Sequence, residues 1–214
     1  METITIKHFV NKDLKPRNEN GKLKYSVYVQ VIVLQKNLRF KSNNNFFEYL
    51  SEDELNNELA QSILKNEKEV IERIVRDLIK NDKKDLITSK NLNLYSQNLN
   101  DTIDNNFSKF LSQEREKTGK FIPNVLFASY REVNEVIYFY NDDSPLTTIS
   151  ENLHYCLNAI QAIYDKTNKK LFYVYDLFFG EKKKEIESCI NYSIDFDHDE
   201  TEKMMKTLRN LVTL

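Results

Sequence analysis

One segment, YSVYVQVIVL from Tyr25 to Leu34, constrains the fold more than any other part of this 214-residue chain. Its residues are nearly all β-branched or aromatic, which favours a β-strand. Strand alternation places the four valines on one side and Tyr28, Gln30 and Ile32 on the other. Because the second side is also largely apolar, the pattern predicts a central strand that is covered on both faces.

Neighbouring segments are expected to pair with this strand. ETITIKHFV, near the start of the chain, alternates enough to form a strand. After Leu34, Lys36 and Asn37 are predicted to form a two-residue turn that leads into a short strand from Leu38 to Ser42. The sequence NENG before Lys22 has the residues of a turn. These elements predict a three-stranded meander.

A long helix is predicted next. SEDE, residues 51 to 54, fits a capping box, and apolar residues then recur at helical spacing as far as Lys80. Residues 81–106 are rich in Asn, Asp, Lys and Ser, which indicates a linker with weak helical content. We therefore expect an α+β fold with a basic β-meander and a long helix in residues 1–80, and an acidic mixed α+β lobe in residues 107–214.

The second lobe is expected to combine helices with strands. Predicted helices cover residues 107–117, 153–164, 181–190 and 201–214, and a capping box at 148–151 precedes the second of them. Predicted strands cover residues 124–130, 133–140 and the aromatic segment LFYVYDLFF, 171–179. Aromatic rings flanked by lysines are typical of sheets that stack single-stranded bases. A core strand is the favoured interpretation, because aromatic strands usually bury their rings.

Charge is distributed unevenly along the chain. Residues 1–45 contain nine Lys or Arg and three acidic residues, whereas the whole chain carries a formal charge of −2. The remainder is therefore acidic. The net charge excludes a nucleic-acid-binding protein that is strongly basic over the whole chain. Any nucleic-acid contact is therefore expected in the N-terminal lobe.

The expected compartment is the cytoplasm. Cys156 and Cys189 both fall in predicted amphipathic helices, where buried free thiols in a reducing environment are expected. No apolar run reaches the length of a membrane span, so no membrane contact is expected, and the start METITIKHFV lacks the regions of a signal peptide.

The sequence contains no recognisable catalytic motif. The three histidines, His8, His154 and His198, have no partner that the sequence identifies, and three glycines are too few for most phosphate- or dinucleotide-binding loops. We expect no enzymatic activity and no cofactor.

Two acidic groupings are candidate metal sites. Asp176 with Glu181 and Lys183 invites comparison with the acid and acid-x-lysine of metal-dependent nucleases, although four intervening residues fit that geometry badly. DFDHDE, residues 195–200, could bind a divalent cation, but acids before the last helix more simply cap its amides. We therefore expect no metal site.

The candidate binding residues lie around the predicted hairpin. Arg39 and Lys41 face one way, with Lys36 nearby, while Leu38 and Phe40 face the other. A basic edge over an apolar back can contact phosphates or lie in a major groove as a ribbon. It is equally typical of a solvated edge strand that lysines protect from aggregation. Both interpretations stay open.

The order of these elements resembles a known family. KPRNENGKLKYSVYVQVIV, a tight turn, NLRFKS and a long charged helix are similar, over residues 3–80, to the N-terminal arm-site DNA-binding domain of mobile-element tyrosine recombinases. The resemblance implies DNA contact by Lys22, Lys24, Lys36, Arg39 and Lys41. The family's glycine and tryptophan signals after the third strand are replaced by NNNFFEYL. No histidine has an arginine three positions later, so the recombinase catalytic domain is absent.

These observations predict a non-catalytic protein of a phage or other mobile element that binds DNA, RNA or a nucleoprotein complex. One alternative is an anti-defence inhibitor, similar to anti-CRISPR proteins, that binds a host RNA-guided nuclease or its guide RNA. A metal-dependent nuclease is the other alternative. The sequence does not predict the oligomeric state.

Overall fold

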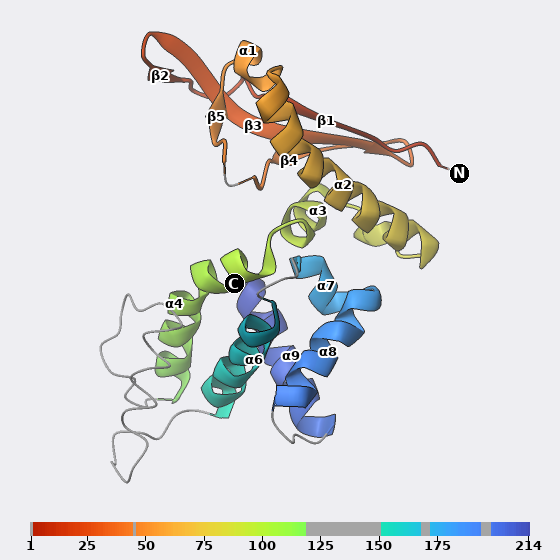
Figure 1. The fold of residues 1–214 in the computed structure, drawn as a ribbon, viewed down its shortest axis with the longest axis vertical. Coiled ribbons are helices and arrows are strands. Elements are labelled where there is room, and N and C mark those ends of the chain that lie inside the picture. Colours follow the sequence, from red (N-terminus) through yellow and green to blue (C-terminus); the bar gives the residue numbers. More distant parts are fainter. Residues whose placement is uncertain (1, 45, 119–150, 168–171, 194–197) are drawn as a thin grey trace. The chain divides into compact units, whose positions relative to one another are not determined.

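The computed structural model describes residues 2–44, 46–118, 151–167, 172–193 and 198–214. The chain divides into two compact units, Met1–Ser96 and Gln97–Leu214. The first unit contains an antiparallel sheet with helices, and the described part of the second consists of helices (Figure 1). The α+β class predicted from the sequence is confirmed.

Strand β3 is the centre of the sheet, because every other strand pairs with it. β1 and β4 flank it on opposite edges, and β2 and β5 pair with its first residues. The strands are β1 (Thr5–Val10), β2 (Arg17–Glu19), β3 (Lys22–Val33), β4 (Lys36–Lys41) and β5 (Tyr49–Leu50). The predicted meander is confirmed as β1, β3 and β4, with two short strands added.

The turn between β3 and β4 lies two residues earlier than predicted. Leu34 and Gln35 have φ angles of 50° and 60°, as the central residues of a type I′ turn do. Lys36 therefore belongs to β4, where it pairs with Val33. The prediction placed the turn at Lys36 and Asn37 and is therefore wrong. Type I′ turns prefer Asn and Gly, and the observed turn has Leu34 and Gln35 instead, so the sequence does not mark it.

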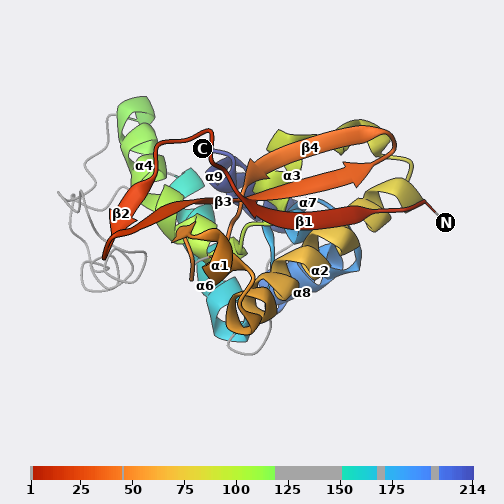
Figure 2. The ribbon, with the colours of Figure 1, turned by 90° about the horizontal axis from the view of Figure 1, so that it is seen from above.

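Only one face of β3 is covered. The four valines at positions 27, 29, 31 and 33 are buried, and Val27 packs in one cluster with Ala60 and Leu64 from the helix side. On the opposite face Ile32 is 42% exposed, and Tyr28 is half-buried. The expectation of a strand covered on both sides is therefore wrong. α1 and α2 lie on the valine side of the sheet (Figure 2).

The predicted helix from residue 51 to 80 is divided into α1 (Glu52–Leu55) and α2 (Glu58–Lys80). The capping box at its start is confirmed, since Ser51 and Glu54 satisfy each other's backbone amides. The helix is interrupted at Asn56 and Asn57. The side chain of Asn57 caps α2 by accepting a hydrogen bond from the backbone amide of Leu59 at 2.8 Å.

Residues 81–106 carry more helix than a linker would. They contain η1 (Lys84–Leu86), α3 (Ser89–Tyr95) and the first turns of α4 (Leu99–Thr118). The boundary between the two units falls inside this range, after Ser96.

The second unit packs α6 against α8 and α9, and α4 against α9. Its remaining helices are α6 (Glu151–Thr167), α7 (Val174–Phe178), α8 (Glu181–Ser193) and α9 (His198–Val212). The predicted helices are confirmed with different ends. The strands predicted at 124–130 and 133–140 lie outside the described residues, as does most of the capping box at 148–151. None of the described helices is both long and apolar enough to cross a bilayer.

The aromatic segment 171–179 is not a core strand. Most of it forms α7, and Tyr173 contributes only an isolated bridge to Asn98. The fully buried carboxylate of Asp176 accepts a hydrogen bond from the Tyr173 amide at 2.9 Å, which satisfies a donor at the helix start. Three of its rings, those of Phe172, Tyr173 and Tyr175, are nevertheless buried, whereas Phe178 and Phe179 are partly exposed.

Candidate nucleic-acid interface

The exposed face of the β1, β3 and β4 sheet carries the strongest candidate site. Paired residues on neighbouring strands share a face, so the register assembles this surface in three rows, which we call the outer face. The rows are Thr5, Ile32 and Asn37; Lys7, Gln30 and Arg39; and Phe9, Tyr28 and Lys41. The outer face thus combines three cations, two carboxamides and two aromatic rings without a carboxylate.

The cations on the outer face differ in their partners. Lys7 and Arg39 are exposed on either side of Gln30, and no described residue forms an ion pair with either of them. Lys41 contacts Glu48, with 2.9 Å between Nζ and Oε1. That pair is half-exposed, and such surface pairs contribute only about 0–1 kcal/mol, so a phosphate can replace Glu48 at little cost.

Aromatic and amide groups orient the middle of the outer face. The ring centres of Phe9 and Tyr28 are 6.0 Å apart, and the guanidinium carbon of Arg39 lies 5.7 Å from the Phe9 centre. This cation–π contact holds Arg39 against the sheet. Gln30 donates a hydrogen bond from Nε2 to Oδ1 of Asn37 at 2.9 Å. The side-chain oxygen of Gln30 and the amino group of Asn37 are not used in this bond and can contact a ligand.

Two of the five residues implied by the family resemblance lie on the outer face, namely Arg39 and Lys41. Lys36 points to the other side, where its Nζ donates to the carbonyl oxygens of Lys84 and Ile87, both at 3.2 Å. Lys22 is exposed on the β2–β3 hairpin, where it pairs with Glu19 across the strands.

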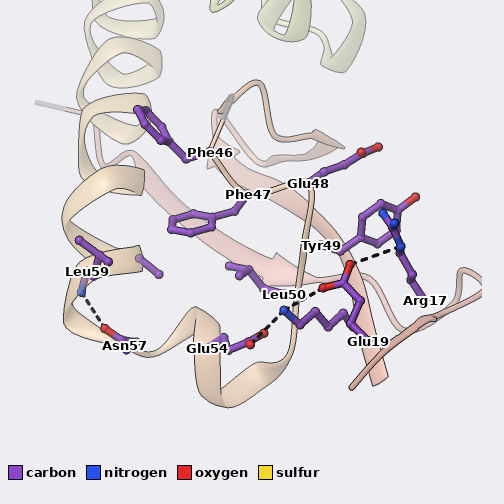
Figure 3. Close-up of a pocket in the computed structure, with 12 residues that line it drawn as sticks. Arg17, Glu19, Phe46, Phe47, Glu48, Tyr49, Leu50, Glu54, Asn57 and Leu59 are labelled. Carbon is purple, nitrogen blue, oxygen red and sulfur yellow. Dashed lines mark hydrogen bonds and ion pairs between the residues drawn. The ribbon is translucent and has the colours of Figure 1, made fainter. Parts of the chain in front are cut away.

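Lys24 is neutralised by two carboxylates. Its Nζ lies 3.1 Å from Glu54 and 3.2 Å from Glu19, and the side chain is only 19% exposed. The hydrogen bonds to Glu54 and Glu19 raise the pKa of Lys24, so the ammonium is held as a structural charge. Lys24 contributes to the lining of a pocket. Figure 3 shows this pocket, with Glu19 and Glu54 labelled. The cations of the candidate site are therefore Lys7, Arg39 and Lys41.

Lys7 is the cation that sequence reasoning missed. It lies in β1, opposite Gln30, and the alternation of β1 with His8 on the covered side is the signal that could have identified it.

A buried polar network anchors β1 from beneath. The carboxylate of Glu67 on α2 accepts from His8 Nε2 at 2.8 Å, from the Ser42 hydroxyl at 2.5 Å and from the Asn43 amide at 2.6 Å. Asn43 donates onward to the carbonyl oxygen of Asn93 on α3 at 2.6 Å. Because His8 is held on the covered side, its neighbours in β1 must project from the outer face.

The residues compared with a nuclease site have local structural contacts in the described chain. Glu181 and Lys183 lie at the start of α8, and Lys183 pairs with Glu187 at 3.3 Å. The carboxylate of Asp176 accepts a hydrogen bond from the Tyr173 amide at the start of α7. Across the described residues, no three His, Cys, Asp or Glu side chains are placed to hold a metal ion.

The remaining candidates are partly described. Residues 195–197 and the side chains of His154 and His198 lie outside the described part of the structure, whereas Asp199 and Glu200 occupy the first turn of α9, as in the capping interpretation. Cys156 is buried in α6, and burial raises the pKa of its thiol. Cys189 is partly exposed, so its predicted burial is wrong.

Comparison with protein-family models, with curated proteins and with solved structures finds no match, so the geometry of the outer face carries the functional argument alone.

Proposed function

We propose that the first unit binds duplex DNA through the outer face of its sheet. The observation that carries this proposal is the gathering of Lys7, Arg39 and Lys41 with two carboxamides on one exposed face whose three rows contain no acidic residue, while helices cover the other face. Nucleic-acid surfaces need cations for phosphates and planar polar groups for base edges, and the outer face offers both.

The dimensions of the sheet support a major-groove contact. Three strands spaced about 4.8 Å apart span about 10 Å between the outer two, which suits a major groove about 12 Å wide. Lys7 and Lys41 lie on opposite edge strands and can reach the phosphates on either side. Arg39, Gln30 and Asn37 are residue types that form hydrogen bonds with guanine or adenine edges.

The test measures binding of the purified chain to a fluorescent duplex by anisotropy at several salt concentrations. Lys7→Ala and Arg39→Ala are each expected to weaken binding and to reduce the salt slope by about 0.9 for the lost phosphate contact. Lys65→Ala is the matched control, because Lys65 is an exposed lysine on α2. Binding that does not depend on salt, or that Lys65→Ala weakens equally, would contradict the proposal.

A second measurement concerns sequence preference. Gln30→Ala and Asn37→Ala remove base-reading groups without changing the charge, so they should leave the salt slope intact and flatten the preference among duplexes selected from a random pool. A chain that binds single-stranded RNA but not duplex DNA would overturn the duplex assignment. A chain that binds neither would favour the inhibitor hypothesis, in which the partner is a host nuclease.

A further inference from the structure

The two edges of the sheet differ in how their backbone groups are satisfied. β1 and β4 lie on opposite sides of β3 (Figure 2). On β4, the backbone amide of Arg39 donates to the Ser89 hydroxyl at 3.2 Å, and the carbonyl oxygen of Lys41 accepts from the Asn93 side chain at 2.9 Å. Ser89 and Asn93 belong to α3, so this helix occupies the edge of β4.

The hydrogen-bonding pattern shows which backbone groups of β1 face away from β3. The amide of Asn11 donates to the carbonyl oxygen of Ser26 at 3.0 Å, and this pair continues the β1–β3 register. Bonded and non-bonded pairs alternate along an antiparallel ladder, so the odd-numbered residues of β1 bond to β3. The backbone amides and carbonyl oxygens of Ile6 and His8 therefore face outward, and no described residue forms a hydrogen bond with these outward groups.

The outward edge of β1 is accessible at His8 and closed further along the strand. The side chain of His8 is 0% exposed while the residue as a whole is partly exposed, so its accessible surface belongs to the main chain. Val10 is buried in a cluster with Leu55 of α1, which ends the open stretch. Backbone donors and acceptors that are open to water along an edge can pair with a strand from another chain.

The side chains along the open stretch define the chemistry of such a strand. Ile6 and His8 project on the covered side of the sheet, and Ile6 is partly exposed, so apolar residues are favoured opposite them. Lys7 projects on the outer face, where it is exposed and forms no ion pair with a described residue. An acidic residue is favoured opposite Lys7 because opposite charges stabilise a cross-strand pair. The complementary strand is therefore apolar, acidic and apolar in turn.

We propose that the edge of β1 binds an extended peptide segment of a partner protein with this apolar–acidic–apolar pattern. The segment adds an antiparallel strand whose backbone pairs with that of Ile6 and His8, and its acidic side chain contacts Lys7. In strand addition, main-chain hydrogen bonds give affinity and alternate side chains give specificity. Lys7 also belongs to the outer face, so the peptide and duplex DNA compete for it. The peptide is nevertheless tested without DNA, so its outcome is separate from that of the DNA proposal.

Anisotropy of a labelled peptide, titrated with the full chain, tests the side-chain pattern. In the probe, valine and threonine alternate around a central glutamate. Lys7→Glu in the chain, or lysine in place of glutamate in the probe, should each weaken binding by about three- to tenfold. Combining the two changes should restore binding. Lys90→Glu is the matched control, because Lys90 is an exposed lysine on α3, and circular dichroism verifies that both variants are folded.

Amide hydrogen exchange tests the backbone pairing at single residues. In the free chain, the amides of Ile6 and His8 should exchange rapidly while that of Lys7 is protected, and the bound probe should slow Ile6 and His8 by about tenfold or more. A probe that is N-methylated at the two valines beside its glutamate should not bind, because these amides donate to β1. The proposal is overturned if the probe does not bind at about 1 mM chain, if Lys90→Glu weakens binding as much as Lys7→Glu, or if the bound probe leaves the exchange of Ile6 and His8 unchanged.

Discussion

Replacing Glu67 by methionine removes the acceptor shared by three donors in a partly buried network while nearly preserving side-chain volume. The donors are His8 Nε2, the Ser42 hydroxyl and the Asn43 amide, at 2.5 to 2.8 Å. The hydroxyl of Ser42 also accepts from the side chain of Asn44, so it can rotate toward other acceptors. The ring of His8 and the amide of Asn43 are fixed by their backbone positions.

The expected loss follows from those two fixed donors. A buried donor without an acceptor costs about 1–3 kcal/mol, and breaking a buried charged network costs about 3–5 kcal/mol. We therefore expect Glu67→Met to lower the free energy of unfolding of the first unit by about 3–5 kcal/mol. Glu67→Gln retains one oxygen for Asn43 but turns an amino group toward His8. This moves the histidine proton to Nδ1, which has no partner, at a cost of about 1–3 kcal/mol.

Urea unfolding followed through the amide signals of β3 measures the first unit by itself. The double variant His8→Leu with Glu67→Met should regain part of the loss, because replacing both partners of a buried hydrogen bond by apolar groups is nearly neutral. A loss below about 1 kcal/mol for Glu67→Met, or equal losses for Met and Gln, would refute the assignment of these donors to the carboxylate.

Three further predictions concern local features. Changing Leu34 and Gln35 to Asn-Gly should stabilise the first unit by about 1–2 kcal/mol, measured by thermal unfolding, since both positions have positive φ. The Ser51 amide, and then Lys24, lower the pKa of Glu54, so its stabilising effect is full above the ordinary value of 4.5 and is lost as the pH falls through the lowered one. When the pH is lowered through the pKa of Glu54, the free energy of unfolding of the Glu54→Gln variant should therefore fall less than that of the parent chain. Urea unfolding at a series of pH values measures this. A thiol reagent should modify Cys189 in the native chain and Cys156 only after unfolding, because Cys156 is buried.

Local sequence patterns predicted the elements whose causes are local. The alternation of β4 placed Leu38 and Phe40 opposite Arg39 and Lys41, which the register confirms. The capping box before α1 was recognisable because its two residues lie three positions apart. In the second unit, the acids were predicted to cap the last helix from just before its start, and Asp199 and Glu200 lie in the first turn of α9.

Features that depend on distant residues were not predictable. Lys36 was grouped with Arg39 because they are close in sequence, but Lys36 donates to the carbonyl oxygen of a residue 48 positions later. β3 was predicted to be covered on both faces because Tyr28 and Ile32 are apolar, but the helices that cover its valine face come from later in the chain. The α7 error had a local signal, since Asp176 three residues after Tyr173 is typical of a helix start.

Strand β3 has a consequence for how the first unit opens. Each of the other four strands forms its ladder with β3 and, in the described sheet, with no other strand. No part of the sheet can therefore keep its pairing once β3 detaches, although β2 or β5 can fray without disturbing β1 and β4. Amide exchange should consequently be slowest in the middle of β3 and should reach the same opening free energy in β1 and β4. The sheet therefore behaves as one cooperative element of β1, β3 and β4, and its two short strands can fray at the N-terminal end of β3.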